Sequence, residues 1–220
     1  MAIAFDTFSQ GSGGGATTAT VSHTCTGTNL ILVTFVEDNS ANTVTGVTYN
    51  SVAMTQAGST QQRTGDQYLS VWVLVNPTSG THDVVATRSS AVGNFNVADV
   101  SYTGAKQSAQ PDAQAQSAPT GTDNDQAVTI IVNNSWLVGA YYCPPASPTG
   151  TRLDGSAGGQ SRDTGFPNNE IGINDSNSDL TTGSHSIGFT FAGSQKVSLQ
   201  AISIAPASAT SSNNFLLTGI

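Results

Sequence analysis

The stretch Ser186-Ile187-Gly188-Phe189-Thr190-Phe191 places a large apolar side chain at every second position. Successive side chains of a β-strand point to opposite faces, so the three apolar residues form one row and the small or polar residues form the other. This period of two predicts a strand with one face in a core and the other against solvent.

Nine further runs rich in Val, Ile, Thr, Tyr and Phe are separated by Gly, Pro, Asn and Ser. They are Leu30–Val36, Val44–Tyr49, Val52–Gln56, Tyr68–Val75, Asp83–Thr87, Phe95–Tyr102, Ala127–Val132, Trp136–Tyr142 and Val197–Ile204. Strong helix formers such as Lys, Glu and Met are scarce. The pattern predicts an all-β protein, a two-sheet antiparallel β-sandwich of jelly-roll-like topology.

Three local features qualify this pattern. Asn50-Ser51 predicts a tight two-residue turn between the runs on either side, because Asn tolerates a positive φ. A change of apolar parity near Ala98-Asp99 predicts a β-bulge, with Asp99 outward or at an edge. The segment Cys143–Ser184 is rich in Pro and Gly and has no sustained period, so we expect a long exposed loop that carries function.

The chain has few charged residues, and most of them are acidic. Only 9% of the 220 residues are charged, the net charge is -8, and Lys and Arg together number six. Nucleic-acid affinity depends on clustered Lys and Arg, so we expect no nucleic-acid partner. No apolar run is long enough to span a bilayer, so we also expect no membrane partner. The start, Met1–Asp6, has neither a basic nor an apolar signal region.

The two ends differ from the body in composition. We expect residues 1–15 to form an N-terminal arm with a Gly-rich hinge, residues 16–206 the sandwich domain, and residues 207–220 a polar linker with an apolar docking arm. Apolar side chains on these ends predict assembly contacts with other subunits of a homo-oligomer. The predicted contact residues are Ile3, Phe5, Phe215, Leu216, Leu217 and Ile220.

Two stretches resemble a known module. Leu74–Thr87 contains Asn-Pro, a Gly-marked turn and a Val/Thr strand, and Val97–Ala105 ends in Ser-Tyr-Thr-Gly. Together with the hairpin at Val44–Gln56, they resemble a β-sandwich module that recurs in minor virion proteins of bacteriophages and in bacterial surface proteins. The resemblance covers about residues 16–206 and implies no catalytic residues. It implies a setting on a virion or a cell surface.

Asp175, Asn177 and Asp179 place oxygen side chains at alternate positions, as a hard cation such as Ca²⁺ requires. The spacing is similar to the opening of an EF-hand loop, but the glycine and the glutamate that this loop needs later are replaced by Leu180 and Ser186. The sequence therefore leaves two interpretations open, a calcium site of another type and a solvated turn. No other cofactor is expected.

Catalytic motifs are weak in this sequence, and we expect no enzyme. The three histidines, His23, His82 and His185, are dispersed and do not have metal-ligand spacing. A glycoside hydrolase would need paired carboxylates, for which the glutamates Glu37 and Glu170, with Asp99, are the candidates.

Aromatic residues near the long segment suggest a different function. Trp72 and Trp136 lie inside apolar runs and are expected in the core. Tyr142 and Phe166 lie at or in the long segment, where they predict contacts with a ligand such as a host-surface glycan.

Three functions follow, in this order. The first is a structural virion protein of a bacteriophage, a capsid decoration or tail or fibre component, made in the host cytoplasm and held by contacts with other subunits. The alternative is a carbohydrate-binding adhesin module for host attachment, extracellular or at a cell surface. The third is a glycoside hydrolase.

Overall fold

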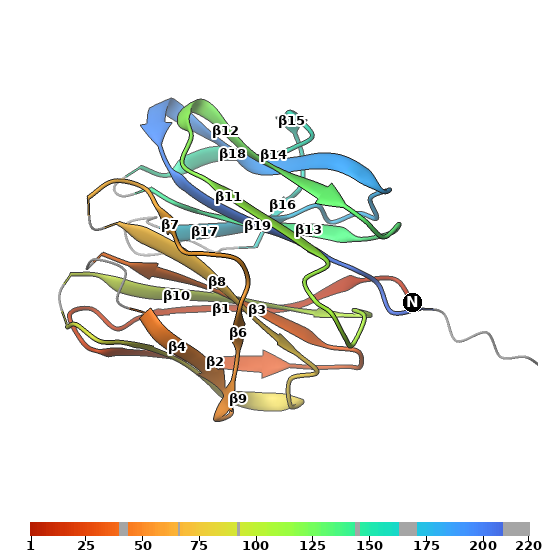
Figure 1. The fold of residues 1–220 in the computed structure, drawn as a ribbon, viewed down its shortest axis with the longest axis horizontal. Helices are drawn as coiled ribbons and strands as arrows, with labels where there is room; N and C mark the ends of the chain where they lie inside the picture. The colour runs from red at the N-terminus through yellow and green to blue at the C-terminus, as the bar shows by residue number, and fades with distance from the viewer. Residues whose placement is uncertain (40–43, 66, 92, 144–145, 163–170, 209–220) are drawn as a thin grey trace, which may run out of the picture.

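The computed structural model describes residues 1–39, 44–65, 67–91, 93–143, 146–162 and 171–208, and these residues contain no helix. The strands form four antiparallel sheets stacked face to face as four layers (Figure 1). The prediction of an all-β sandwich is confirmed, and the four sheets form two such sandwiches, one on the other.

The first sandwich contains the N-terminal half of the chain. Its outer sheet has the strand order β2 (Thr18–Cys25), β9 (Gly80–Arg88), β4 (Val44–Tyr49), β5 (Val52–Ala53). Its inner sheet has the order β1 (Ala4–Ser12), β10 (Phe95–Thr103), β3 (Ile31–Asp38), β8 (Tyr68–Val75), β6 (Thr55–Gln56), and β7 (Gln61–Gln62) also pairs with β8.

The second sandwich contains the C-terminal half. Its inner sheet has the order β11 (Ala113–Ser117), β19 (Ser198–Ile204), β13 (Trp136–Tyr142), β17 (Ile171–Asp175), β16 (Gln160–Ser161). Its outer sheet has the order β12 (Thr120–Ile130), β18 (Gly183–Lys196), β14 (Pro148–Leu153), β15 (Ser156–Ala157).

The core consists of apolar clusters between successive layers. The largest joins the two inner sheets and includes Phe35 and Val100 on one side and Val138 and Ile202 on the other. A second cluster fills the first sandwich, and two more fill the second sandwich. Both inner sheets are therefore covered on both faces, which explains why β3, β10, β13 and β19 are buried along almost their whole length.

The two halves repeat one topology. If the strands of each sandwich are counted in chain order and β7 is left out, both halves have the same strand order in the outer and the inner sheet. The hairpin turns match as well: Asn50 and Ser51 have positive φ in one half, and Asp154 and Gly155 have positive φ in the other. Each hairpin is fastened to the neighbouring strand by one backbone bond, from Asn50 N to Asp83 O and from Asp154 N to Ser186 O.

Strand register extends this correspondence to single residues. Asp83 and Ser186 are equivalent, so His82 is equivalent to His185. His82 pairs with His23 in β2, and His185 pairs with Val128 in β12, so His23 corresponds to Val128.

The inner sheets correspond in the same way. Their pairings with β6 and β16 make Val33 equivalent to Val138. From this equivalence, the strand registers make Asp99 equivalent to Ala201 and Ser9 equivalent to Ala115.

Two local predictions are wrong. The register between β10 and β3 is regular, and the bulge lies instead in β1, between Phe5 and Phe8. Since β10 is buried on both faces, its change of apolar parity needs no extra residue. The segment Cys143–Ser184 contains β14 to β17 and the start of β18 rather than a long loop. The predicted turn at Asn50-Ser51 is confirmed.

The Gly-rich segment after β1 is anchored by the buried Arg88. The guanidinium donates to the carbonyl oxygens of Gly14 and Ala16 and pairs with Asp38 at 2.9 Å. It also lies over the ring of Phe95. The segment that the sequence presents as a hinge is therefore a turn held by charge-assisted hydrogen bonds.

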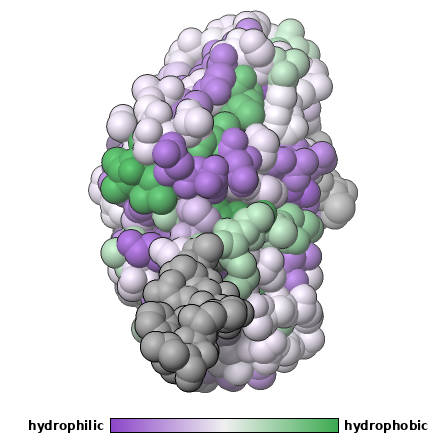
Figure 2. Space-filling model, turned by 90° about the vertical axis from the view of Figure 1, so that its right-hand side faces the viewer, coloured by the Kyte–Doolittle hydropathy of each residue, from purple (hydrophilic) through white to green (hydrophobic). Residues whose placement is uncertain are grey.

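Neutral polar residues dominate the surface. On the face that carries the N-terminus, Figure 2 shows hydrophilic and hydrophobic residues in small patches among pale, intermediate ones. The large apolar side chains that are exposed in the described chain, Met1, Val52 and Ile131, are scattered in sequence. Single exposed apolar residues of this kind are ordinary for a folded protein.

Candidate functional site

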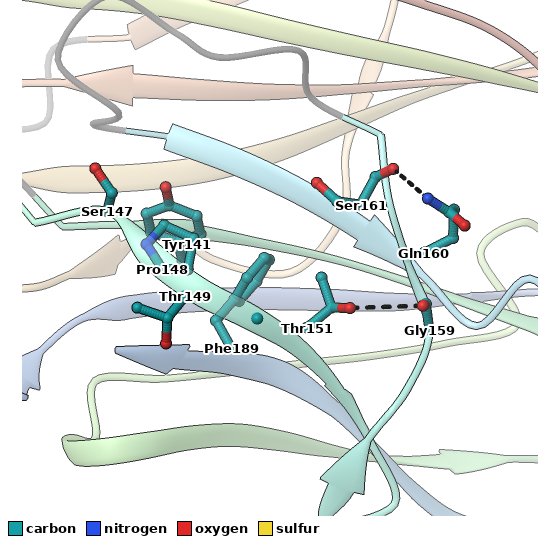
Figure 3. A pocket seen from close by; sticks show the side chains of 10 residues that line it. Tyr141, Ser147, Pro148, Thr149, Thr151, Gly159, Gln160, Ser161 and Phe189 are labelled. Atoms are coloured by element: carbon teal, nitrogen blue, oxygen red, sulfur yellow. Dashed lines mark hydrogen bonds between the residues drawn. The ribbon is translucent and has the colours of Figure 1, made fainter. Parts of the chain in front are cut away.

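A pocket of about 410 Å³ opens in the second sandwich, within the range of small-molecule sites. Its walls come from β13 and β18 and from β14 and β16, two strands that the sequence does not identify (Figure 3). The lining residues are Tyr141, Ser147, Pro148, Thr149, Gly150, Thr151, Gly159, Gln160, Ser161 and Phe189.

The pocket floor is aromatic and rigid. The rings of Tyr141 and Phe189 meet edge to face with centroids 4.6 Å apart. Phe191, two residues further along β18, also packs edge to face against Tyr141. Tyr141 and Phe189 are 0% and 2% exposed. The floor therefore presents very little ring surface to a ligand and no free stacking face.

Hydroxyl and amide groups surround this floor (Figure 3). Thr149 Oγ1 donates to the carbonyl of Thr190, and Thr151 Oγ1 donates to that of Gly159 over a long 3.5 Å. Gln160 Nε2 donates to the carbonyl of Ser161, which leaves the second amide hydrogen of Gln160 for another acceptor. These groups can exchange weak internal bonds for bonds to a ligand.

The lining formed by described residues has no Asp, Glu, Lys, Arg or His. An ionised ligand would find no countercharge there, and a wholly apolar ligand would desolvate the hydroxyl groups without replacing their bonds. A neutral molecule with many hydroxyl groups satisfies both conditions.

The predicted ligand-binding residue Tyr142 does not line this pocket. Tyr142 is fully buried in the cluster between the two inner sheets, because strand alternation turns it away from the pocket. Its neighbour Tyr141 lines the pocket instead. Phe166 lies outside the described residues.

The three predicted calcium ligands are close to protein donors. Arg162 binds the Asp175 carboxylate with two bonds of 2.7 and 2.9 Å and donates to Asn177 Oδ1 at 2.7 Å. Tyr102 from the first half also donates to Asp175, at 2.9 Å, and Trp136 Nε1 donates to Asp179 Oδ1 at 3.0 Å. A guanidinium therefore lies where a cation would have to bind, and the calcium site stays a prediction.

The predicted N-terminal contact residues are covered by their own chain. Ile3 is buried in the cluster between the inner sheets, and Phe5 packs against that cluster. The Arg162 guanidinium lies 4.2 Å from the centre of the Phe5 ring. The contacts of these residues thus need no second subunit. The C-terminal contact residues Phe215, Leu216, Leu217 and Ile220 lie outside the described residues.

The two candidate carboxylates for hydrolysis that the structure describes, Glu37 and Asp99, are buried away from the pocket. Glu37 is fully buried and accepts a hydrogen bond from Asn96. Asp99 is also fully buried, in a central strand, so its predicted outward or edge position is wrong. Glu170 lies outside the described residues. A substrate has no access to the two described carboxylates.

A second hollow of about 380 Å³ lies on the outer sheet of the first sandwich, beside the β4–β5 hairpin. Its lining includes Asn50, His82 and Asp83. Unlike the pocket of the second sandwich, it carries ionisable groups.

A search of protein families finds none that matches this chain, and a search of curated proteins finds no match either. Among solved structures, the chain is similar to one described as "Biofilm associated protein - BSP domain". The identity is 9%, the TM-score is 0.30, and the match covers 92% of this chain and 50% of the other. The chain thus spans about half the length of that protein. A similarity this low carries no argument about function.

Among the described residues, no helix is long and apolar enough to cross a membrane.

Proposed function

We propose that this protein is a non-catalytic module at a particle or cell surface that binds a carbohydrate in the pocket of the second sandwich. The observation that carries this proposal is the lining of that pocket, an aromatic floor surrounded by hydroxyl and amide groups without charge among the described residues. Sugars present the matching chemistry, neutral hydroxyl groups for the polar rim and small C–H surfaces that need no stacking face.

The rigidity of the site supports the same function. Tyr141 and Phe189 belong to strands inside their sheets, and the rim lies on β14, next to the last strand of its sheet, and on the edge strand β16. A ligand that meets a preformed pocket loses less free energy to ordering of the protein. The polar residues of β14 and β16 that line the rim can vary without disturbing the apolar cores.

The test is glycan binding by wild-type protein and by Thr151→Val and Gln160→Ala, which remove polar groups from the rim. We expect each variant to bind more weakly by about tenfold, the effect of one lost hydrogen bond to a neutral ligand. The matched control is Thr48→Val, which changes a threonine in the hollow of the first sandwich. Equal binding by all four proteins would contradict the proposal.

A structural role in a bacteriophage virion is the second candidate, and the position of the chain ends favours it. The Met1 amino group donates to the carbonyl of Ala207 at 2.9 Å, so the N-terminus and the start of the C-terminal tail lie side by side. An apolar tail that begins there can attach the body to other subunits from one end. Deleting residues 209–220 should leave the thermal unfolding temperature unchanged and abolish incorporation into particles. Normal incorporation would contradict this role.

A further inference from the structure

A chain of hydrogen bonds runs through the interior of the first sandwich. Thr34 Oγ1 donates to Asp99 Oδ1 at 2.6 Å, and Ser9 Oγ lies 3.3 Å from Asp99 Oδ2. The same Ser9 oxygen lies 2.7 Å from Nδ1 of His23, which is 1% exposed. Four strands, β1, β2, β3 and β10, thus meet through polar side chains in the interior.

The chain continues from the other ring nitrogen. Nε2 of His23 lies 3.0 Å from Ser101 Oγ and 3.2 Å from Thr7 Oγ1. Ser101 Oγ donates to Asp6 Oδ2 at 2.8 Å, and Thr7 Oγ1 donates to the carbonyl of Thr24. The buried Asp99 is therefore connected to the half-buried Asp6 by a continuous path.

The second sandwich shows that this fold does not need such a chain. The positions of His23, Ser9 and Asp99 are taken there by Val128, Ala115 and Ala201, which pack in one apolar cluster. Burying polar groups costs free energy relative to an apolar core. The polar chain of the first sandwich therefore has a role beyond holding the sheets together.

Counting hydrogens shows that the chain is complete in one protonation state. If Asp99 is protonated, it donates to Ser9, Ser9 donates to Nδ1 of His23, and Nε2–H of His23 donates to Ser101. The Ser101 and Thr7 hydroxyl groups then keep their bonds to Asp6 and to the Thr24 carbonyl. Every hydroxyl group in this chain of hydrogen bonds then donates to one acceptor.

Ionisation of Asp99 removes one bond. The carboxylate then needs the Ser9 hydrogen, so Nδ1–H of His23 must donate to Ser9, and Nε2 becomes an acceptor. A hydrogen for Nε2 must come from Ser101 or from Thr7. Either Asp6 or the Thr24 carbonyl then loses its hydrogen bond from the Ser101 or Thr7 hydroxyl, where β1 meets β2, although Asp6 keeps its bonds from Thr26.

We propose that this chain of side chains is a proton-sensitive latch that fastens β1 to β2, complete when Asp99 is protonated and short of one hydrogen bond when it is ionised. Burial raises the pKa of Asp99 to about 7, where a modest change in pH shifts the balance between the two states. Burial also lowers the pKa of His23 to about 4, so the ring is neutral in both states and changes only its tautomer.

The other ionisable groups around the latch in the described part of the chain are Asp6 on β1, Cys25 on β2, Tyr49 on β4 and His82 on β9, which pairs with His23 and meets the Tyr49 ring edge to face. Burial raises the pKa of the Cys25 thiol and of the Tyr49 hydroxyl, so both stay neutral across the range in which Asp99 titrates. Asp99 is itself hydrogen-bonded to Ser9 within the latch, so it is the group that switches it.

The test is NMR of the His23 imidazole, whose ring carbon and nitrogen shifts distinguish the two neutral tautomers. As the pH rises through about 7, His23 should change from the Nε2–H to the Nδ1–H form, and β1 amide protons should exchange faster relative to those of β11. Asp99→Asn supplies a permanent donor to Ser9, so its His23 should stay in the Nε2–H form at every pH.

Ser9→Ala breaks the link without removing the acid, and it serves if Asp99→Asn does not fold. Its Asp99 should titrate while the His23 tautomer stays independent of pH. His82 and His185 provide internal references. A His23 tautomer that does not change with pH in the wild-type protein, or that changes equally in Ser9→Ala, would overturn the proposal, as would a doubly protonated ring near neutral pH.

Discussion

His23 and Val128 occupy equivalent positions in the two sandwiches, each paired across its outer sheet with an equivalent histidine of the neighbouring strand. Equivalent interior positions are thus filled by polar side chains in the first sandwich and by apolar side chains in the second. The C-terminal half can be used as an internal reference for what the N-terminal half requires.

The pKa shifts of His23 and Asp99 have opposite effects on how the free energy of unfolding changes with pH. The folded-state pKa of His23 lies below its ordinary 6.5, so the unfolded chain takes up that proton first and stability falls as the pH drops from 6.5 to about 4. The folded-state pKa of Asp99 lies above its ordinary 3.8, so stability falls as the pH rises from 3.8 to about 7. In the wild-type protein the two effects largely cancel.

Single substitutions should expose each effect. Asp99→Asn should lose roughly 2–3 kcal/mol of unfolding free energy between about pH 6.5 and pH 4, because only the histidine effect remains. His23→Val should show the opposite slope and become more stable as the pH falls. Urea unfolding at several pH values measures both. Parallel pH profiles for the two variants would contradict this account.

Arg88 should be a strong determinant of stability. Arg88→Met leaves the buried Asp38 without its cation and the carbonyls of Gly14 and Ala16 without this donor. We expect a loss of about 3–5 kcal/mol in the free energy of unfolding, measured by urea titration. Arg152→Met breaks more exposed pairs with Asp123 and Asp125 and should cost about 1 kcal/mol or less. Similar losses for the two variants would be inconsistent with the buried pair.

The two cysteines should remain free thiols in the folded protein. Cys25 lies in the core of the first sandwich and Cys143 in that of the second, and both are fully buried. Burial raises the pKa of both thiols, which lowers their reactivity further. An alkylating reagent should modify them only after denaturation, as followed by mass spectrometry. A cross-linked Cys25–Cys143 peptide would contradict this arrangement.

Calcium should leave the unfolding temperature unchanged. The Arg162 guanidinium already neutralises Asp175 and binds Asn177, so a divalent cation would have to displace it. Differential scanning fluorimetry with excess Ca²⁺ and with a chelator makes the comparison. If calcium raises the unfolding temperature in the wild-type protein, the oxygen side chains form a cation site after all.

Apolar patterning in the sequence was sufficient to predict the central strands. The runs Val44–Tyr49, Tyr68–Val75 and Trp136–Tyr142 coincide with β4, β8 and β13. Each is rich in residues that a two-sided or half-buried strand needs. The same signal fails for β14 (Pro148–Leu153), whose Pro, Gly and Thr residues form a strand because β18 supplies its hydrogen-bond partners.

The candidate site was harder to predict for the same reason. Thr149, Thr151, Gln160 and Ser161 lie on strands without an apolar period, and they meet only because β14 and β16 border the same opening. Tyr141 could have been identified from strand parity, since alternation separates it from Tyr142. The polar latch could not be predicted from the sequence either, because Ser9, His23 and Asp99 are far apart in sequence and share no local motif.

The central claim is that the pocket of the second sandwich binds a neutral carbohydrate. A glycan array probed with wild-type protein, Gln160→Ala and the control Thr48→Val tests it most directly. We expect wild-type and Thr48→Val to bind the same neutral glycans and Gln160→Ala to lose most of that signal. If the array shows no bound glycan, or if Gln160→Ala binds as well as the wild-type protein, the claim is wrong.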